Sequence, residues 1–149
     1  VLNLSSDLKE QFGLSYLFIS HDLGVVRHMS DRVAVMYLGR IVEIATRDDL
    51  YGEPLHPYTR ILLDAVAVPD PQIERARDHV LLQGEVPSVA TPPPGCPFHP
   101  RCPSAMPVCS REIPPLRLHG NRQIACHLYD ETAAKKAIEA AMDGNGNPN

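Results

Sequence analysis

Four cysteines lie within one short, proline-rich segment, where their thiols could hold a metal or form disulfides. Cys96, Cys102, Cys109 and Cys126 have the spacing C-x5-C-x6-C-x16-C. Zinc sites usually contain two close C-x2–4-C pairs, and these gaps are wider. The spacing also differs from the common ferredoxin patterns. On spacing alone, disulfides, a zinc site, an iron–sulfur cluster and free structural thiols all remain open.

Three histidines lie near these cysteines and could complete a zinc site, because imidazole is a common zinc ligand. They are His99, His119 and His127. The segment has few apolar side chains from which to build a core of its own. We therefore expect a metal centre here to stabilise the fold of the segment rather than to carry out redox catalysis.

A second chemically interesting residue is His21, which follows the apolar stretch 16–20 (YLFIS) and precedes Asp22. A continuous apolar run predicts a strand over 15–20 that is buried on both faces, as in a parallel sheet covered by helices. Ligands of open α/β sheets bind beyond the carboxyl ends of the strands, so His21 could face a ligand. The alternative is a structural histidine that caps the next helix or binds a loop.

The elements around these residues predict an α/β fold. Asp22 suits the start of a short helix over 23–29, and Gly39 provides the tight turn of a hairpin between strands 32–37 and 40–45. Thr46 and Asp49 resemble a capping box that opens another short helix. Two further helices are predicted over 1–12 and 58–67, with His56 near the start and Pro57 in the first turn of the second.

Composition limits the class of protein. The chain has 149 residues, 44% of them apolar, and a formal charge of −4. The acidic balance argues against a nucleic-acid-binding domain, and no apolar run approaches the roughly 20 residues of a membrane-spanning helix. A proline-rich linker is predicted over 69–95, a cysteine-rich module over 96–128, and a helix with a frayed tail over 129–149. Because of the linker, we expect the module to fold separately from residues 1–68.

The stretch "LFISHDLGVVRHMSDRVAVMYLGRIVE", residues 17–43, resembles the end of the ATPase domain of ATP-binding-cassette (ABC) proteins. The resemblance implies that His21 is the switch-loop histidine, which contacts the γ-phosphate of ATP and helps to position the attacking water. The phosphate-binding loop, the signature segment and the Asp-Glu that holds Mg²⁺ are absent from this sequence. The resemblance therefore implies the C-terminal part of such a domain, with ATP and Mg²⁺ bound mainly by residues outside it.

Two further stretches resemble the C-terminal extension of the ATPases of oligopeptide and dipeptide importers, a group that includes some nickel importers. They are "EPLHPYTRILLDAV" (53–66) and "GEVPSVATPPPGCPFHPRCPSAMPVC" (84–109), the latter followed by "IACH" (124–127). The resemblance implies a [4Fe–4S] cluster on the four cysteines, with zinc as the alternative. The reducing compartment of such an ATPase disfavours disulfides.

The implied function is the ATP-hydrolysing subunit that energises peptide import from the cytoplasmic face of the plasma membrane. Its implied partners are transmembrane permease subunits, a second identical or related ATPase subunit and, indirectly, an extracytoplasmic peptide-binding protein. We expect the 149 residues alone to be inactive as an ATPase. The alternative is a truncated, non-catalytic module that docks on a partner or holds a metal centre.

Overall fold

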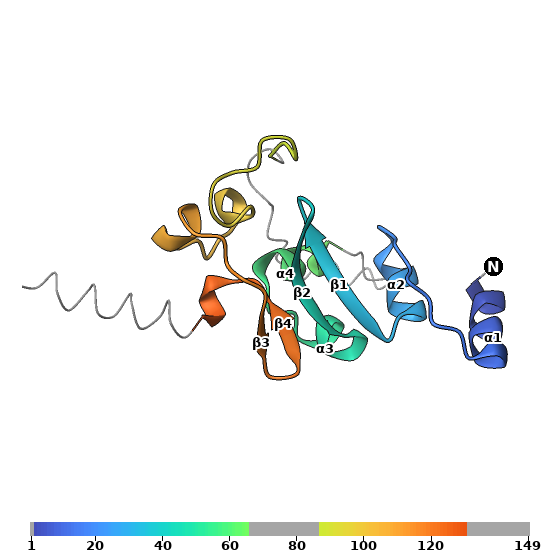
Figure 1. Ribbon diagram of the computed structural model, residues 1–149. Coiled ribbons are helices and arrows are strands. Elements are labelled where there is room, and N and C mark those ends of the chain that lie inside the picture. Colours follow the sequence, from blue (N-terminus) through green and yellow to red (C-terminus); the bar gives the residue numbers. More distant parts are fainter. Residues whose placement is uncertain (1, 66–86, 131–149) are drawn as a thin grey trace, which may run out of the picture.

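The computed structural model describes residues 2–65 and 87–130, and its elements are labelled in Figure 1. The first two helices are α1 (Leu2–Phe12) and α2 (Leu23–Met29). Both were predicted, and Asp22 caps α2 as expected, because its side chain accepts a hydrogen bond from the amide of Val25. The expected linker falls partly, and the helix expected within 129–149 almost wholly, outside the described residues.

The strand predicted over 15–20 is wrong for this structure. The segment is extended but belongs to no sheet, and Leu17 and Ile19 are 92% and 89% exposed. A strand forms only where its backbone amides and carbonyls pair with a neighbour, and the described residues provide none here. Burial on both faces is therefore also wrong for this chain, although the apolar pattern of the segment is real.

The sheet consists of two antiparallel hairpins. Strands β1 (Arg32–Tyr37) and β2 (Arg40–Thr46) form the predicted hairpin, and its turn places Leu38 and Gly39 at φ +45° and +76°. Positive φ at both turn residues matches the twist of a two-residue hairpin loop. The α/β class is thus confirmed as helices on a sheet, but the parallel sheet expected near His21 is not found among the described residues.

The second hairpin, which the sequence did not predict, comes from the cysteine-rich segment. Strands β3 (Arg117–His119) and β4 (Arg122–Ile124) extend the sheet in the order β1-β2-β4-β3. Strand β4 pairs with β2 through Glu43 opposite Ile124. The regions before and after the expected linker therefore share one sheet, rather than packing as two separate units.

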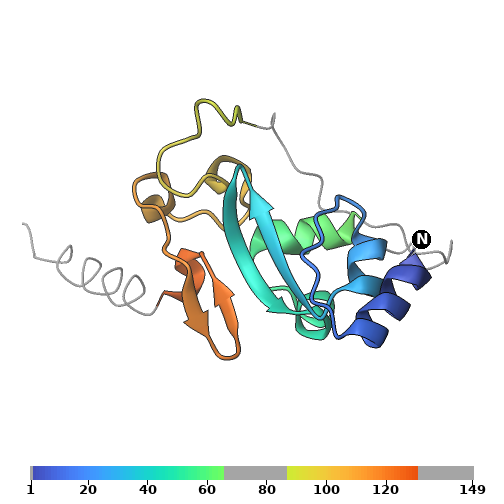
Figure 2. The ribbon, with the colours of Figure 1, turned by 45° about the vertical axis from the view of Figure 1, so that its right-hand side comes forward.

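Helices α3 (Arg47–Gly52) and α4 (Pro57–Asp64) lie on the same side of the β1–β2 hairpin (Figures 1 and 2). The capping prediction for α3 is confirmed, since Thr46 Oγ1 accepts the amide of Asp49 at 3.2 Å. Helix α4 begins with His56 as its N-cap and Pro57 in its first turn, as predicted, but it ends at Asp64 rather than at 67.

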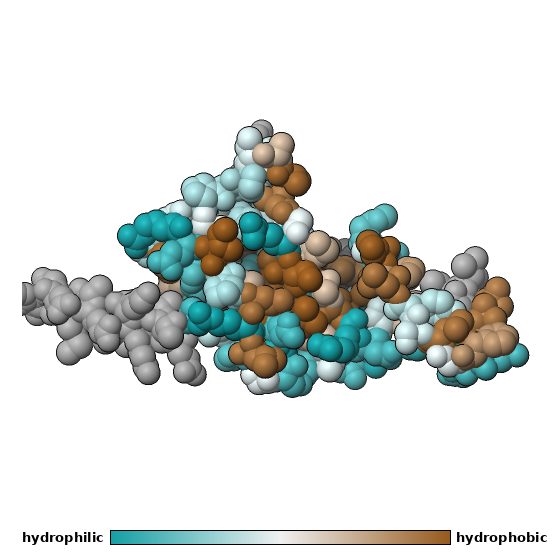
Figure 3. Space-filling view, in the orientation of Figure 1, coloured by the Kyte–Doolittle hydropathy of each residue, from teal (hydrophilic) through white to brown (hydrophobic). Residues whose placement is uncertain are grey.

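The core lies between the hairpin, the two helices and the cysteine-rich segment. Alternate residues of β1 face it, namely Val33, Val35 and Tyr37. The opposite face of the hairpin exposes Met36 and Ile41, and Figure 3 shows hydrophobic residues at the surface there and over α1. The helices therefore cover one face of the sheet, and nothing among the described residues covers the other.

Candidate functional site

His21 lies on the surface, and hydrogen bonds of the next residue hold the backbone beside it. The next residue, Asp22, accepts the amide of Val25 at 3.1 Å, and its own amide donates to Ser20 Oγ at 3.0 Å. Asp22 is therefore the N-cap of α2, and His21 is not. The His21 side chain is exposed and has no hydrogen-bond partner within the described part of the chain. Its imidazole is free to donate to, or accept from, a ligand.

Helix α3 contacts the start of α2 through Tyr51. Tyr51 Oη donates a hydrogen bond to the carbonyl of Leu23 at 2.6 Å, and the guanidinium of Arg27 lies 5.5 Å from the centre of the Tyr51 ring. Burial raises the pKa of Tyr51, so its hydroxyl keeps the proton that it donates. The backbone that presents His21 is thus attached to α3.

The four cysteines are free thiols, and Cys96 and Cys109 are buried. Burial, with a smaller contribution from the charges of Cys96, Cys102 and Cys109, raises the pKa of Cys126 to about 12. Burial also raises the pKa of Cys96 and Cys102. Thiols in such surroundings keep their protons unless a cation offsets the charge. The electrostatic interaction among all four sulfurs indicates that they lie in the same region of the fold.

Backbone amides lie near the sulfurs and counteract the effect of burial. Those of Phe98 and His99 lower the pKa of Cys96, that of Ser104 lowers the pKa of Cys102 and that of Leu128 lowers the pKa of Cys126. The amide of Met106 lies 3.4 Å from Cys109 Sγ. Amide donors stabilise the negative charge of thiolates and tune iron–sulfur clusters. The donor set around these thiols therefore suits thiolate ligands.

Short turns bring the cysteines together. The 3₁₀ helices η1 (His99–Arg101), η2 (Pro107–Ser110) and η3 (His127–Tyr129) each include a cysteine or adjoin one. The amide of Cys96 donates to the carbonyl of Cys109 at 2.8 Å and joins two of these turns. Gly95, at φ +70°, permits this approach, because a Cβ there would lie 2.3 Å from the Cys109 oxygen. The segment is less irregular than the sequence suggested.

Two of the histidines considered as zinc ligands each use one ring nitrogen in a hydrogen bond to the backbone, and the Nδ1 of His127 is buried without a partner in the described part of the chain. His99 Nδ1 donates to the carbonyl of Cys96 at 2.9 Å, and His127 Nε2 donates to the carbonyl of Glu112 at 2.9 Å. The His119 ring packs against Tyr129, with 5.0 Å between centroids. Within residues 2–65 and 87–130, no three His, Cys, Asp or Glu side chains are placed to bind a single ion. This arrangement does not favour a zinc site with histidine ligands.

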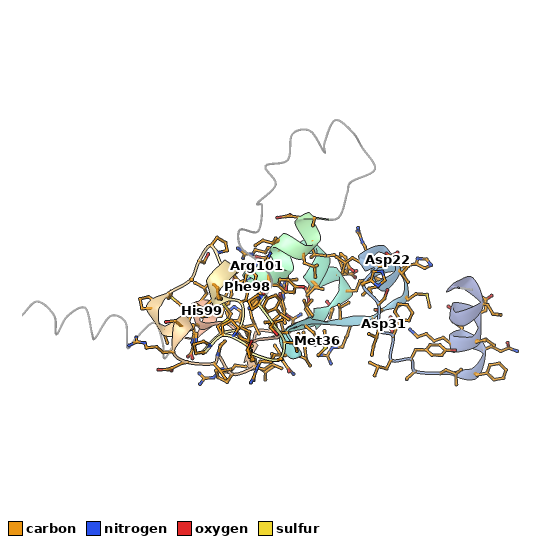
Figure 4. The ribbon with its side chains drawn as sticks, turned by 90° about the horizontal axis from the view of Figure 1, so that it is seen from above. Asp22, Asp31, Met36, Phe98, His99 and Arg101 are labelled. Atoms are coloured by element: carbon orange, nitrogen blue, oxygen red, sulfur yellow. The ribbon has the colours of Figure 1, made fainter. Side chains whose placement is uncertain are left out.

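Phe98, between the first two cysteines, anchors the cysteine-rich segment in the core. It is 1% exposed and contacts three rings, with centroid distances of 5.2 Å to Tyr37, 5.4 Å to Tyr58 and 5.9 Å to His56. Figure 4 shows Phe98 pointing inward while the neighbouring His99 belongs to the cysteine-rich loops. Sequence reasoning missed this role, although a lone aromatic residue among prolines and cysteines is a usable signal.

A buried carboxylate, also missed, fixes the start of α4. Glu43 is 0% exposed, and its two oxygens accept the amides of Leu55 at 2.9 Å and of His56 at 3.0 Å. His56 Nδ1 in turn accepts the amide of Tyr58 at 3.1 Å, and burial lowers the pKa of His56 to about 4. The residues "HPYT" form a helix start, as predicted, and the structure adds that this start is buried and supports the fold rather than a reaction.

Comparison with known proteins gives a consistent family. Residues 42–109 match the family model described as "Oligopeptide/dipeptide transporter, C-terminal region". The chain is 52% identical over 130 residues to the oligopeptide transport ATP-binding protein AppF of Bacillus subtilis (strain 168), covering 87% of this chain and 40% of that protein. It is 50% identical over 130 residues to the oligopeptide transport ATP-binding proteins OppF of Escherichia coli (strain K12) and Salmonella typhimurium (strain LT2), covering 87% of this chain and 39% of each.

The chain thus spans about two fifths of the length of these curated relatives. None of the helices in its described part is both long and apolar enough to cross a membrane.

Proposed function

Since this chain belongs to the oligopeptide/dipeptide ABC transporter family and corresponds to the C-terminal part of its ATP-binding proteins, we propose that it is part of the ATP-hydrolysing subunit of a peptide importer. The similarity to curated transport ATP-binding proteins over 87% of the chain carries this proposal. Permease subunits, a second ATPase subunit and a peptide-binding protein would be its partners. It would work, bound to the permeases, at the cytoplasmic face of the membrane, using ATP and Mg²⁺.

Within this function, we propose that His21 acts on the γ-phosphate. Its exposed imidazole, with Asp22 rather than itself capping α2, supports this role. A ring N–H can donate to a γ-phosphate oxygen and help to place the attacking water, because phosphoryl transfer depends on positioning and on charge stabilisation. The contact strengthens as charge develops on the phosphate, so it lowers the barrier more than it raises affinity.

The test is His21→Ala in the full-length subunit, assembled with its permeases. We expect turnover to fall about 10²-fold, or about 3 kcal/mol, with little change in nucleotide affinity. His28→Ala is the matched control, since His28 is exposed on α2 and has no role in the proposal. Wild-type turnover in His21→Ala would remove the catalytic role of this residue.

We also propose that Cys96, Cys102, Cys109 and Cys126 together hold one [4Fe–4S] cluster. The backbone amides near the sulfurs support this proposal, because such donors stabilise thiolate ligands. The cluster would supply iron–thiolate bonds that join the three short turns. The chain would hold it through the backbone that Gly95 and the Cys96–Cys109 hydrogen bond bring together.

Metal analysis after anaerobic purification tests this site. We expect about four irons and four sulfides per chain with a brown visible spectrum, and loss of iron in Cys126→Ser but not in Ser104→Ala. One zinc per chain without iron would contradict the [4Fe–4S] cluster and support a zinc site instead. Four freely titratable thiols with neither metal would exclude both.

Two features bear on the alternative of a non-catalytic module. The apolar segment 14–20 and the outer face of the β1–β2 hairpin are exposed, and we propose that the remainder of a full-length subunit covers them. We expect the 149 residues alone to show no Mg²⁺-dependent ATP hydrolysis, because they lack the phosphate loop and the Mg²⁺ carboxylate. Turnover by the purified chain would contradict this assignment.

A further inference from the structure

Helix α3 contacts the start of α2, just after His21, and the β3–β4 hairpin, which precedes Cys126. On one side, Tyr51 Oη donates to the carbonyl of Leu23, two residues after His21, at 2.6 Å. On the other side, Asn121 Nδ2 donates to Asp49 Oδ2 at 2.8 Å from the turn before β4. Strand β4 leads directly to Cys126. The helix is therefore placed to transmit the position of one segment to the other.

Several side-chain contacts attach α3 to the β3–β4 hairpin. Arg122 is 9% exposed, and its guanidinium donates to the carbonyl of Glu53 and lies 3.5 Å from Asp49 Oδ1. Asp49 also accepts the hydroxyl of Thr46 at 2.7 Å, so this carboxylate is held from three directions. A short helix of six residues gains its rigidity from such contacts, because few backbone hydrogen bonds stabilise it.

The contact from Tyr51 to α2 is specific. The first carbonyl of α2, that of Leu23, receives the tyrosine hydroxyl, and the ring of Tyr51 lies under the guanidinium of Arg27 on the same helix. Asp22 restrains the amide end of α2 and Tyr51 restrains the adjoining carbonyl. Together these contacts fix both the position and the direction of the backbone that carries His21.

We propose that Tyr51 is a positioning residue for His21, and that the β3–β4 hairpin holds α3, and so Tyr51, in place. The inference rests on the proposed function, in which His21 acts on the γ-phosphate. Tyr51 would act on His21 only through the backbone of α2, to which it is hydrogen-bonded. Its hydrogen bond keeps the imidazole where small displacements would reduce transition-state contact more than substrate binding.

The experiment compares Tyr51→Phe with Tyr129→Phe in the full-length subunit within its transport complex. Both variants remove a tyrosine hydroxyl that donates to a backbone carbonyl, since Tyr129 Oη lies 3.1 Å from the oxygen of Leu55. Of these two tyrosines, only Tyr51 is hydrogen-bonded to α2. We expect Tyr51→Phe to lower kcat about 3- to 10-fold with KM unchanged, and Tyr129→Phe to leave kcat at the wild-type value.

A second measurement tests the contact between Tyr51 and α2 without relying on ATPase activity. The amides of Val25 and Val26 bind Asp22, at 3.1 Å to its side chain and 3.0 Å to its carbonyl. Their hydrogen exchange should be about 3- to 10-fold faster in Tyr51→Phe than in Tyr129→Phe. A merely structural role would lower stability in both variants without this local difference.

The outcomes separate the two proposals. If His21→Ala lowers kcat about 10²-fold while Tyr51→Phe matches Tyr129→Phe in kcat and in exchange, the positioning role is wrong and the proposed function stands. If His21→Ala keeps wild-type turnover, the proposed catalytic role fails, and the positioning role fails with it. Faster exchange at Val25 together with a lower kcat supports the inference.

Discussion

Segment 14–20 and segment 96–109 reverse what their compositions suggest. The first is nearly continuous in large apolar residues, yet Leu17 and Ile19 are 92% and 89% exposed. The second is rich in proline and cysteine, yet Phe98 is 1% and Cys96 8% exposed. The difference shows that burial depends on a surface that closes over a residue. Segment 96–109 has the rings beside β1 and α4 as that surface, whereas segment 14–20 has no such surface among the described residues.

We expect the largest effect on stability from Phe98, the most buried residue of segment 96–109. Phe98→Ala removes a ring packed against Tyr37, Tyr58 and His56, and should lower the free energy of unfolding by about 3–5 kcal/mol. Urea denaturation measures the loss. Leu118→Ala, at a side chain 76% exposed, is the control and should change it by less than about 0.5 kcal/mol. Equal effects of the two substitutions would contradict the role of Phe98.

A pH titration tests the same core through His56. Burial lowers the pKa of His56 from 6.5 to about 4. Between these two pH values, His56 is protonated in the unfolded chain but neutral in the folded chain. The neutral, buried His56 therefore contributes roughly 3 kcal/mol to the free energy of unfolding. This contribution is fully present above pH 6.5 and is lost as the pH falls toward 4. His56→Asn keeps an acceptor at the N-cap but removes the titration. The stability of the wild type should therefore approach that of His56→Asn as the pH falls; a constant difference would refute the prediction.

Glu43→Gln should have a smaller effect. The amide nitrogen that replaces one carboxylate oxygen cannot accept the backbone N–H of Leu55 or of His56, so one buried donor loses its partner. We expect a loss of about 2 kcal/mol in the free energy of unfolding. Glu10→Gln, on the exposed face of α1, should leave it unchanged. A neutral Glu43→Gln would mean that the carboxylate only fills space.

The smallest effect is expected in the exposed apolar segment. Leu17→Ser in the 149-residue chain should change the free energy of unfolding by less than about 0.5 kcal/mol. In the full-length subunit, where we propose that this segment is covered, the same substitution should cost about 2 kcal/mol. Equal values in the two proteins would mean that segment 14–20 stays exposed in both.

Local signals in the sequence were sufficient for elements that depend on neighbouring residues. Asp22, Thr46 and His56 each cap a helix as predicted, and Gly39 forms the hairpin turn. These features depend on contacts within about four residues, which the sequence displays directly. They explain why the region from Asp22 to Asp64 was predicted well.

Long-range pairing was not predictable in the same way. Strands β3 and β4 have only three residues each, and nothing in "RLH" or "RQI" indicates that β4 pairs with β2. Glu43 looks like an ordinary exposed strand residue until the approach of Leu55 and His56 buries it. The roles proposed for His21 and the cysteines came from resemblance, and local pattern alone left their alternatives open.

The pairing of β2 with β4 also affects the order in which the protein is made. Glu43 and its partner Ile124 are separated by about 80 residues, so at synthesis rates of about 5–20 residues per second β2 is made roughly 4–16 s before β4. During that interval the β1–β2 hairpin has an open edge of unpaired amides and carbonyls. The nascent chain is therefore most exposed to aggregation before its cysteine-rich end has been translated. Slower translation of residues 65–121 should lower the yield of folded protein.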